Sequence, residues 1–453
     1  MNTIAAIATP LGAGGVAMIR VSGEDAVSIA GRVFFPVSGR AVSEMRGYTA
    51  CYGEIRDGGT RIDDGVLLIY RAPHSYTGED TAEISCHGGT YAAKRVLAAC
   101  FNAGAEPAQA GEFTKRALLN GKLSLTQAEA VADIIAAQNE QFLTVSNSQR
   151  EGALYRRIRG IADELLSVIT LIQAWIDYPD EMEDEFDGNL EADKLRGVIR
   201  ELDELLASYG EGQILRDGLP CAIVGKPNAG KSTLMNLLTG TERSIVTDIE
   251  GTTRDIIEET VTLGGIMLRL ADCAGIRGTD DIVESIGVER MLKKIDESAL
   301  IFAVFDSSRP LSEEDERLIA HIKNKRVICI INKTDLPEAA DTARLESIFP
   351  DTLRISAKDP AASAAIAEAA ARLSGIGDLD LNSGFIANER QRRCAAEARD
   401  FTEQACSALM QGMTLDAVGI MCENALDRLY ELSGEQVGEN VIDQVFSRFC
   451  VGK

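Results

Sequence analysis

The chain has 453 residues, of which 45% are hydrophobic and 26% are charged. At roughly 150 residues per domain, this length predicts a soluble protein of about three domains. Its 46 Lys and Arg against 70 Asp and Glu give a formal net charge of −24. This balance argues against a protein that holds nucleic acid or an anionic membrane by its overall charge, although it allows a local basic patch or a partner that does the holding.

Three further features bear on location. The N-terminal stretch has no basic segment, since the first arginine is Arg20, and this predicts the absence of a secretory signal. No apolar run approaches the roughly 18 residues that a membrane-spanning helix needs. The ten cysteines are scattered without a C-x-x-C pair, which is typical of reduced thiols. We therefore expect a cytoplasmic protein.

The first half of the chain predicts two different domains. Residues 1–118 contain short apolar runs at 17–21, 66–70 and 81–86 separated by glycine-containing turns, which indicates an α+β domain. From residue 119 to 217 the pattern becomes helical, with apolar side chains at alternating steps of four and three. This stripe favours the core of a helical bundle and comprises Leu154, Ile158, Ile161, Leu165, Val168, Ile172 and Trp175.

From residue 218 to 375 strands and helices alternate. Strand-like runs at 221–224, 266–271, 300–305 and 327–331 predict a mostly parallel, doubly wound sheet. A linker at 374–384 then leads back to helices at 388–410 and 415–432. We therefore predict a multidomain fold: an α+β domain at 1–118, an all-α domain at 119–217 plus 376–453, and an inserted α/β domain at 218–375.

The strongest local signal is GKPNAGKS at residues 225–232, which matches G-x-x-x-x-G-K-[ST]. It follows the strand at 221–224 and opens a helix at 233–238, as a phosphate-binding loop requires. Gly225 and Gly230 let backbone N–H groups converge on phosphate oxygens. Lys231 reaches the β- and γ-phosphates, and Ser232 offers its hydroxyl to Mg²⁺.

Three motifs then follow in the order of a guanine-nucleotide domain. DCAG at 272–275 ends a strand, so that Asp272 can hold Mg²⁺ through water and the Gly275 N–H can sense the γ-phosphate. NKTD at 332–335 ends the strand at 327–331, where Asp335 can accept both N–H donors of the guanine edge. SAK at 356–358 follows the strand at 352–355 and closes over the base. The four motifs together predict a GTP-binding P-loop domain.

The catalytic position departs from that of Ras-like GTPases, which place a glutamine directly after D-x-x-G. Here Ile276 stands there and can orient no water. Two candidates can neutralise the negative charge that develops between the β- and γ-phosphates during hydrolysis. One is a monovalent cation held by Asn228 and backbone carbonyls of residues 247–255, and the other is Arg254 acting as an arginine finger. A solvated switch loop is the plain alternative, and the residues alone do not decide.

These motifs resemble the TrmE–Era–Der group of GTPases, and features along the whole chain narrow the resemblance to the MnmE (TrmE) family of tRNA-modification GTPases. The N-terminal matches are TIAAIATP at 3–10, GGV at 14–16 and RVSG at 20–23, and the C-terminal match is FCVGK at 449–453. The internal matches are YTGED at 76–80, HGG at 87–89, GEFTKRA at 111–117 and NGKLSLTQAEA at 120–130.

The resemblance implies a GTP hydrolase that works with an FAD- and NADH-using partner, MnmG. Together they take part in (carboxymethyl)aminomethyl modification at C5 of the wobble uridine of certain tRNAs. It implies a homodimer whose G domains meet when GTP and K⁺ are bound, which stimulates hydrolysis, and a heterotetramer or larger complex with MnmG. FAD would enter only through the partner, and tRNA would bind mainly to the complex.

Carried over by motif, the K⁺ ligands are the Asn228 side chain and the backbone of Thr247, Ile249 and Thr252, and the Mg²⁺ ligands are Ser232 and Thr253. Glu284 would orient the attacking water through a second water, and Arg254 would be a switch residue. We therefore favour the cation over the arginine finger. The predicted nucleotide-binding residues are Asn228, Ala229, Gly230, Lys231, Ser232, Thr233, Thr247, Asp248, Ile249, Glu250, Gly251, Thr252, Thr253, Asp272, Cys273, Ala274, Gly275, Asn332, Lys333, Thr334, Asp335, Ser356, Ala357 and Lys358.

The family also binds a one-carbon derivative of tetrahydrofolate, the 5-formyl or 5,10-methylene form, between the N-terminal domains of the dimer. Motif matching puts Arg20, Glu79 and Lys122 at that site, with Lys453 close by. The basic groups would pair with the carrier's carboxylates, and Glu79 would accept N–H bonds from the pterin. The resemblance also marks Cys450 as a candidate in the modification chemistry; the alternative is a small buried hydrophobic side chain.

Three positions depart from the family pattern, and one acidic segment lies outside the matched motifs. Leu11 and Ala13 stand where the N-terminal turn is expected to hold Pro and Arg, and Cys273 replaces the commoner Thr of D-T-A-G. Residues 177–187 hold seven carboxylates in eleven residues, which favours a solvated acidic loop.

Two other functions fit parts of the sequence. An Era- or Der-like ribosome-assembly GTPase would use nucleotide state to gate RNA binding, but residues 376–453 are not basic, as an RNA-binding C-terminal module would be. A scaffold whose G domain only reports nucleotide state would show negligible turnover even with K⁺.

Overall fold

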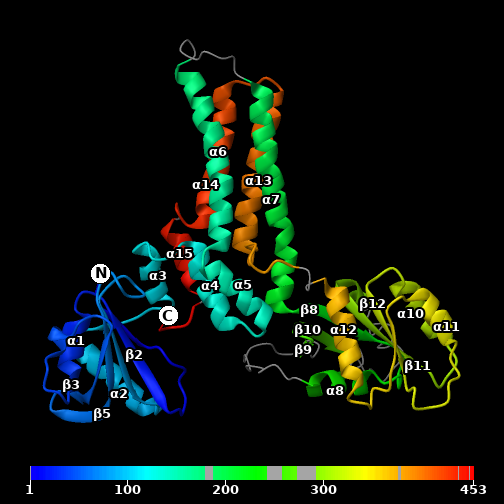
Figure 1. Cartoon of the computed structure of the whole chain (residues 1–453), viewed down its shortest axis with the longest axis horizontal. Helices are drawn as coiled ribbons and strands as arrows, with labels where there is room; N and C mark the ends of the chain where they lie inside the picture. Colours follow the sequence, from blue (N-terminus) through cyan, green and yellow to red (C-terminus); the bar gives the residue numbers. More distant parts are fainter. Residues whose placement is uncertain are drawn as a thin grey trace, which may run out of the picture. The chain divides into compact units, whose positions relative to one another are not determined.

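The computed structural model describes residues 2–178, 187–241, 258–272, 292–375, 379–436, 438–447 and 449–452 (Figure 1). The chain splits into two compact units. The first comprises Met1–Ala132, Arg150–Ile169 and Cys422–Lys453, and the second comprises Asp133–Gln149 and Thr170–Met421. This division does not test the three predicted domain boundaries, which stay a prediction.

The first unit contains a seven-stranded sheet in the order β3-β4-β5-β6-β2-β1-β7. Neighbouring strands are antiparallel except for β1 and β7, which are parallel. Helices α1 (Ala26–Val33) and α2 (Thr90–Asn102) pack on the sheet through one apolar core. The strands are β1 (Ile4–Ile7), β2 (Val16–Ser22), β3 (Phe34–Pro36), β4 (Thr49–Asp57), β5 (Thr60–Tyr70), β6 (Thr81–His87) and β7 (Glu106–Pro107), with a 3₁₀ turn at η1 (Val42–Glu44).

The C-terminal part of the chain packs in this unit as well. Residues of α4 (Leu125–Ala136) and α15 (Glu439–Phe446) share an apolar cluster that includes Phe446 and Phe449. Val451 then forms an isolated bridge to Ala110, just before α3 (Glu112–Leu119). This places the last described residues beside the N-terminal sheet.

The second unit contains the predicted doubly wound sheet, in the order β13-β12-β11-β8-β10-β9. All of its strand pairs are parallel except β9 with β10. In β12 every residue is buried, as expected for a parallel strand covered on both faces. The strands are β8 (Leu219–Val224), β9 (Glu258–Leu263), β10 (Ile266–Asp272), β11 (Leu300–Asp306), β12 (Val327–Asn332) and β13 (Thr352–Arg354); the helices around them are α8 (Lys231–Thr241), α10 (Glu313–Ile322), α11 (Thr342–Ile348) and α12 (Ala362–Ser374).

Long helices make up the rest of the described chain: α5 (Glu140–Arg150), α6 (Ala153–Asp177), α7 (Gly188–Asp217), α13 (Glu389–Met410) and α14 (Leu415–Ser433). In the second unit α7 packs along α13 (Figure 1). The predicted stripe on α6 is confirmed, since its aliphatic members from Leu154 to Ile172 are at most 1% exposed; Trp175 is half-buried. None of the described helices has the length and apolar character needed to cross a membrane.

Candidate functional site

The loop between β8 and α8 has the backbone that phosphate binding requires. Gly225 and Gly230 have φ values of +145° and +107°, which side chains other than glycine rarely allow. A Cβ atom on Gly230 would also lie 2.0 Å from Asn332 Nδ2. Lys231 is 9% exposed and donates from Nζ to the carbonyls of Gly225 and Lys226, at 2.7 Å each. Its ammonium group therefore lies over the loop that would receive the phosphates.

The first turn of α8 presents two further predicted residues to solvent. Ser232 and Thr233 are exposed, and they follow Lys231 at the N-terminus of the helix. Unpaired N–H groups and the helix dipole favour an anion at this end. The hydroxyl of Ser232 is accessible to a Mg²⁺ ion bound beside such an anion.

Asn332 ties the predicted base-binding motif to the phosphate loop. Its side chain is 3% exposed; Nδ2 donates to the Ala229 carbonyl and Oδ1 accepts from the Ala357 N–H, both at 2.9 Å. One buried amide thus joins residues 225–232, 332–335 and 356–358. The structure brings together three of the four segments that the sequence predicted.

Asp335 lies at the exposed end of this network. Ser356 Oγ donates to Asp335 Oδ1 at 2.9 Å, and Lys358 Nζ lies 3.7 Å from Oδ2. The hydrogen bond from Ser356, and then Lys358, lower the pKa of the Asp335 carboxyl below its usual value. The group is therefore an ionised acceptor at neutral pH, as recognition of two adjacent N–H donors requires. Thr334 donates its N–H to the Ile355 carbonyl at 3.3 Å and so joins the same two segments.

Asp272 is the last residue of β10, where its backbone pairs in register with Ile223 of β8. Several predicted residues lie outside the described residues, so their roles remain predictions. They are Thr247, Asp248, Ile249, Glu250, Gly251, Thr252, Thr253, Arg254, Cys273, Ala274, Gly275, Glu284 and Lys453.

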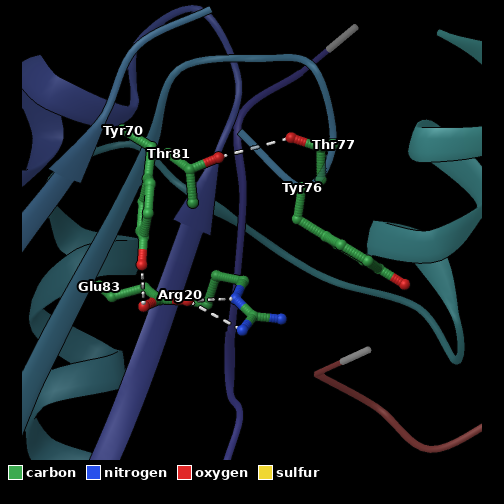
Figure 2. A pocket seen from close by; sticks show the side chains of 6 residues that line it. All are labelled: Arg20, Tyr70, Tyr76, Thr77, Thr81 and Glu83. Carbon is green, nitrogen blue, oxygen red and sulfur yellow. Dashed lines mark hydrogen bonds and ion pairs between the residues drawn. The ribbon is translucent and has the colours of Figure 1, made fainter. Parts of the chain in front are cut away.

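In the first unit, Arg20 of β2 lines a cavity of about 210 Å³ together with Tyr70, Tyr76, Thr77, Thr81 and Glu83 (Figure 2). Its guanidinium is held by Glu83, with Nη2 2.8 Å from Oε1, and Nη1 donates to the Gly452 carbonyl at 3.3 Å. Tyr70 also donates to Glu83, at 3.3 Å. The cavity therefore has a fixed cation and lies next to the C-terminal segment, whereas Glu79 and Lys122 are not among its lining residues.

Glu79 and Lys122 have partners of their own. Arg116 Nη1 lies 3.2 Å from both carboxylate oxygens of Glu79, and Ser22 Oγ donates to Oε2 at 2.8 Å. A carboxylate has further lone pairs, so Glu79 can still accept bonds from a ligand. The exposed Lys122 donates to the Pro73 carbonyl at 3.1 Å. The buried Arg116 was missed by sequence reasoning, although it lies in the GEFTKRA motif.

Cys450 is exposed, so its interpretation as a small buried side chain is wrong. The other described cysteines are buried, apart from Cys51, which is half-buried. Burial raises the pKa of Cys86 to about 11 and that of Cys100 to about 12, which keeps these thiols protonated and unreactive.

A mostly parallel sheet whose strand ends carry a phosphate loop, an N-K-x-D motif and a closing S-A-K turn defines a P-loop guanine-nucleotide-binding protein. Two family models match almost the whole chain: the GTP-binding protein TrmE N-terminus over residues 3–122 and the MnmE helical domain over residues 125–450. The chain belongs to the MnmE (TrmE) family of tRNA modification GTPases.

Relatives confirm this over the full length. The tRNA modification GTPases MnmE of Acetivibrio thermocellus and Geobacillus kaustophilus are 38% and 40% identical over 100% of this chain and 99% of their own. That of Geobacillus thermodenitrificans is 41% identical with the same coverage. Among solved structures, Aquifex aeolicus Era bound to GDP and aluminium fluoride is 26% identical over 40% of this chain and 65% of its own, with a TM-score of 0.28. The full-length match favours the tRNA-modification function over an Era- or Der-like one.

Proposed function

We propose that this chain, a GTP hydrolase acting in tRNA modification, works as a homodimer with an MnmG partner on C5 of the wobble uridine. Hydrolysis would be stimulated when the G domains meet with GTP and K⁺ bound. The FAD would belong to the partner, and a one-carbon derivative of tetrahydrofolate would bind to the N-terminal unit. The observation that carries GTP binding is the Asn332 network, which joins the phosphate loop to Asp335 and its neighbours.

Asn228 supports the cation part of the proposal. Its φ of +65° turns the loop between the exposed Pro227 and the buried Ala229, and its backbone carbonyl accepts a hydrogen bond from Lys333 at 2.7 Å. The side-chain amide is exposed and has no hydrogen bond within the described residues. Its oxygen therefore remains available as a K⁺ ligand, with Ser232 available for Mg²⁺. A bound K⁺ would supply one positive charge next to the reacting phosphates, as an arginine does elsewhere.

The cation mechanism is tested by measuring GTP turnover in KCl and in NaCl at equal ionic strength. We expect turnover to be at least tenfold faster in KCl, and we expect Asn228→Ala to remove most of that difference while GDP still binds. Equal rates of the unchanged protein in both salts would eliminate the cation mechanism. Negligible turnover in KCl with MnmG present would instead favour a scaffold.

Arg20 supports the proposed carrier site. Its charge faces a cavity, and Glu83 and the Gly452 carbonyl hold it in place. We expect calorimetric titration with 5-formyltetrahydrofolate to show binding to the unchanged protein and at least a tenfold loss for Arg20→Ala, because a charge-assisted contact to the carrier's carboxylate is removed. Unchanged binding by Arg20→Ala would place the carrier elsewhere.

A further inference from the structure

Asp306, the last residue of β11, belongs to none of the motifs that identify the nucleotide site, yet it contacts one of them. Its Oδ2 accepts a hydrogen bond from Lys333 Nζ at 2.7 Å, and the two side chains are 13% and 27% exposed. We propose that Asp306 is a positioning residue for nucleotide binding, which acts through Lys333 on the phosphate loop.

The Asp306 carboxylate is itself fixed. Ser308 donates to Oδ1 twice, from its backbone N–H at 2.9 Å and from Oγ at 2.6 Å, so that Oδ2 is left for Lys333. Burial would raise the pKa of Asp306, but the hydrogen bonds from Lys333 and Ser308 outweigh it and lower the pKa below its usual value. The carboxylate is therefore ionised and oriented before any nucleotide binds.

The same turn also holds the backbone of Lys333. Ser307 Oγ donates to the Lys333 carbonyl at 3.1 Å, and the Ser307 N–H donates to the Asn332 carbonyl at 3.0 Å. Lys333 has a φ of +65°, a conformation that residues other than glycine adopt only when their surroundings stabilise it. Residues 306–308 therefore fix both the main chain and the side chain of Lys333.

Lys333 connects Asp306 to the phosphate loop. Its ammonium group donates to the Asn228 carbonyl at 2.7 Å as well as to Asp306, and Asn228 is the other non-glycine residue of the phosphate loop and the N-K-x-D motif with a positive φ. Without Asp306, the partly buried ammonium would keep only one fixed partner, and the loop at Asn228 would lose a constraint. A loop that must be ordered on binding gives weaker affinity than one that is already ordered.

The test is a double-mutant cycle on the affinity of the full chain for a fluorescent N-methylanthraniloyl derivative of GDP. We expect Asp306→Asn to weaken binding about tenfold, which corresponds to about 1.4 kcal/mol. In a Lys333→Met background, which already lacks the ammonium, the same substitution is expected to change the affinity less than twofold. Equal losses in both backgrounds would overturn the proposal, because they would show that Asp306 does not act through Lys333.

Asp351→Asn is the matched control. Like Asp306→Asn, this substitution removes one negative charge from the second unit. The Asp351 carboxylate forms an ion pair of the same length, 2.7 Å to Arg372, but it does not contact the phosphate loop. We expect the Asp351→Asn variant to bind the fluorescent GDP derivative within twofold of the unchanged protein. A loss of affinity equal to that of Asp306→Asn would also overturn the proposal. If Asp306→Asn does not fold, Ser308→Ala replaces it in the cycle, with an expected loss of about threefold that disappears in the Lys333→Met background.

The inference builds on nucleotide binding but not on the cation. GDP titration requires neither K⁺ nor hydrolysis, so equal turnover in KCl and NaCl would remove the proposed cation mechanism and leave this result intact. Conversely, additive effects of Asp306→Asn and Lys333→Met on GDP affinity would overturn the role of Asp306 but would leave the cation mechanism unaffected.

Discussion

Buried polar side chains that bond to the backbone decide the geometry of the nucleotide site. Asn332 uses both ends of its amide on neighbouring segments, and Lys231 uses its ammonium on two loop carbonyls. Leaving such a group without a partner costs about 1–3 kcal/mol, so each residue favours one arrangement of the segments that it joins. Asp335, which we predict to select the base, is in contrast exposed.

Asp335→Asn should invert the choice of base. The amide would present one donor and one acceptor in place of two acceptors, which matches xanthine better than guanine. We expect the affinity for GDP to fall by at least about 100-fold and that for XDP to rise, because one of the two N–H donors of guanine would lose its acceptor. Competition titrations with GDP and XDP measure this. Ser356→Ala is the control, since it removes only the support of Asp335 and should keep guanine preferred.

His87 and Asp63 form an ion pair in the N-terminal sheet, with Nδ1 2.7 Å from Oδ1. The hydrogen bond that His87 donates to the Asp63 carboxylate raises the pKa of His87 above its usual value. For Asp63, burial raises the pKa, but the hydrogen bonds that it accepts from His87 outweigh burial and lower the pKa below its usual value. The stabilisation from His87 is therefore complete below about pH 6.5 and is lost as pH rises through the raised pKa. The stabilisation from the Asp63 carboxylate is present above about pH 3.8 and is lost as pH falls through its lowered pKa.

NMR titration can follow this pair, because the chain has only three histidines. In Asp63→Asn we expect the pKa of His87 to fall toward its ordinary value, and we expect this variant to lose less stability above pH 8 than near pH 5.5. His87→Gln assigns the signal. An unchanged His87 pKa in Asp63→Asn would contradict the ion pair.

The predicted site residues and the missed ones differ in how they can be recognised. Lys231, Ser232 and Asp335 belong to contiguous motifs whose chemistry is complete within a few residues. Asp306 and Arg116 contact Lys333 and Glu79, which lie far along the chain, and no local motif indicates these partners.

At the scale of elements, strands and helices with regular apolar patterns were predicted well. The runs at 17–21, 66–70 and 81–86 lie in β2, β5 and β6, and those of the inserted domain lie in its parallel strands. Strand β4 was missed. It alternates poorly, pairs with β5 through an irregularity between Ile55 and Arg56, and has Gly53 pressed against Phe35, where a Cβ would lie 2.4 Å from the Phe35 carbonyl oxygen.

Two glycines of α7 test how this helix packs. A Cβ on Gly212 would lie 2.5 Å from the Ile386 carbonyl oxygen, whereas one on Gly210 would meet nothing within 4 Å. We expect Gly212→Ala to destabilise the second unit by about 1–3 kcal/mol, because the backbone of residues 385–387 must move. Gly210→Ala should instead stabilise it by up to about 1 kcal/mol through helix propensity.

The midpoint of denaturant unfolding, followed by circular dichroism, compares the two variants. Each carries one added methyl group, and the two sites are two residues apart on the same helix. A Gly212→Ala variant as stable as Gly210→Ala would show that the α7 backbone does not approach residue 386 this closely.

At the scale of the whole molecule, the charge of −24 has a consequence for RNA binding. Phosphate contacts dominate nucleic-acid affinity and weaken with salt, and an acidic chain disfavours them. We expect the isolated protein to bind tRNA more weakly than about 10 μM at about 150 mM salt, and the complex with MnmG to bind it well. Filter-binding titrations with and without MnmG measure this, and tight, sequence-specific binding by the isolated chain would contradict this division of roles.

The amino-acid pattern was enough to predict the order of the GTPase motifs, the helical and α/β regions and the family. Each of these features depends on residues that lie close together in the chain, so their spacing and periodicity are sufficient to predict it. The contacts between side chains far apart in the chain, in contrast, could be identified only in the folded protein. The register of β11 against β12 sets Asp306 beside Asn332, and so brings Lys333 between Asp306 and the phosphate loop. Pairing of this kind depends on the free energy of packing whole strands, which no local pattern of residues encodes.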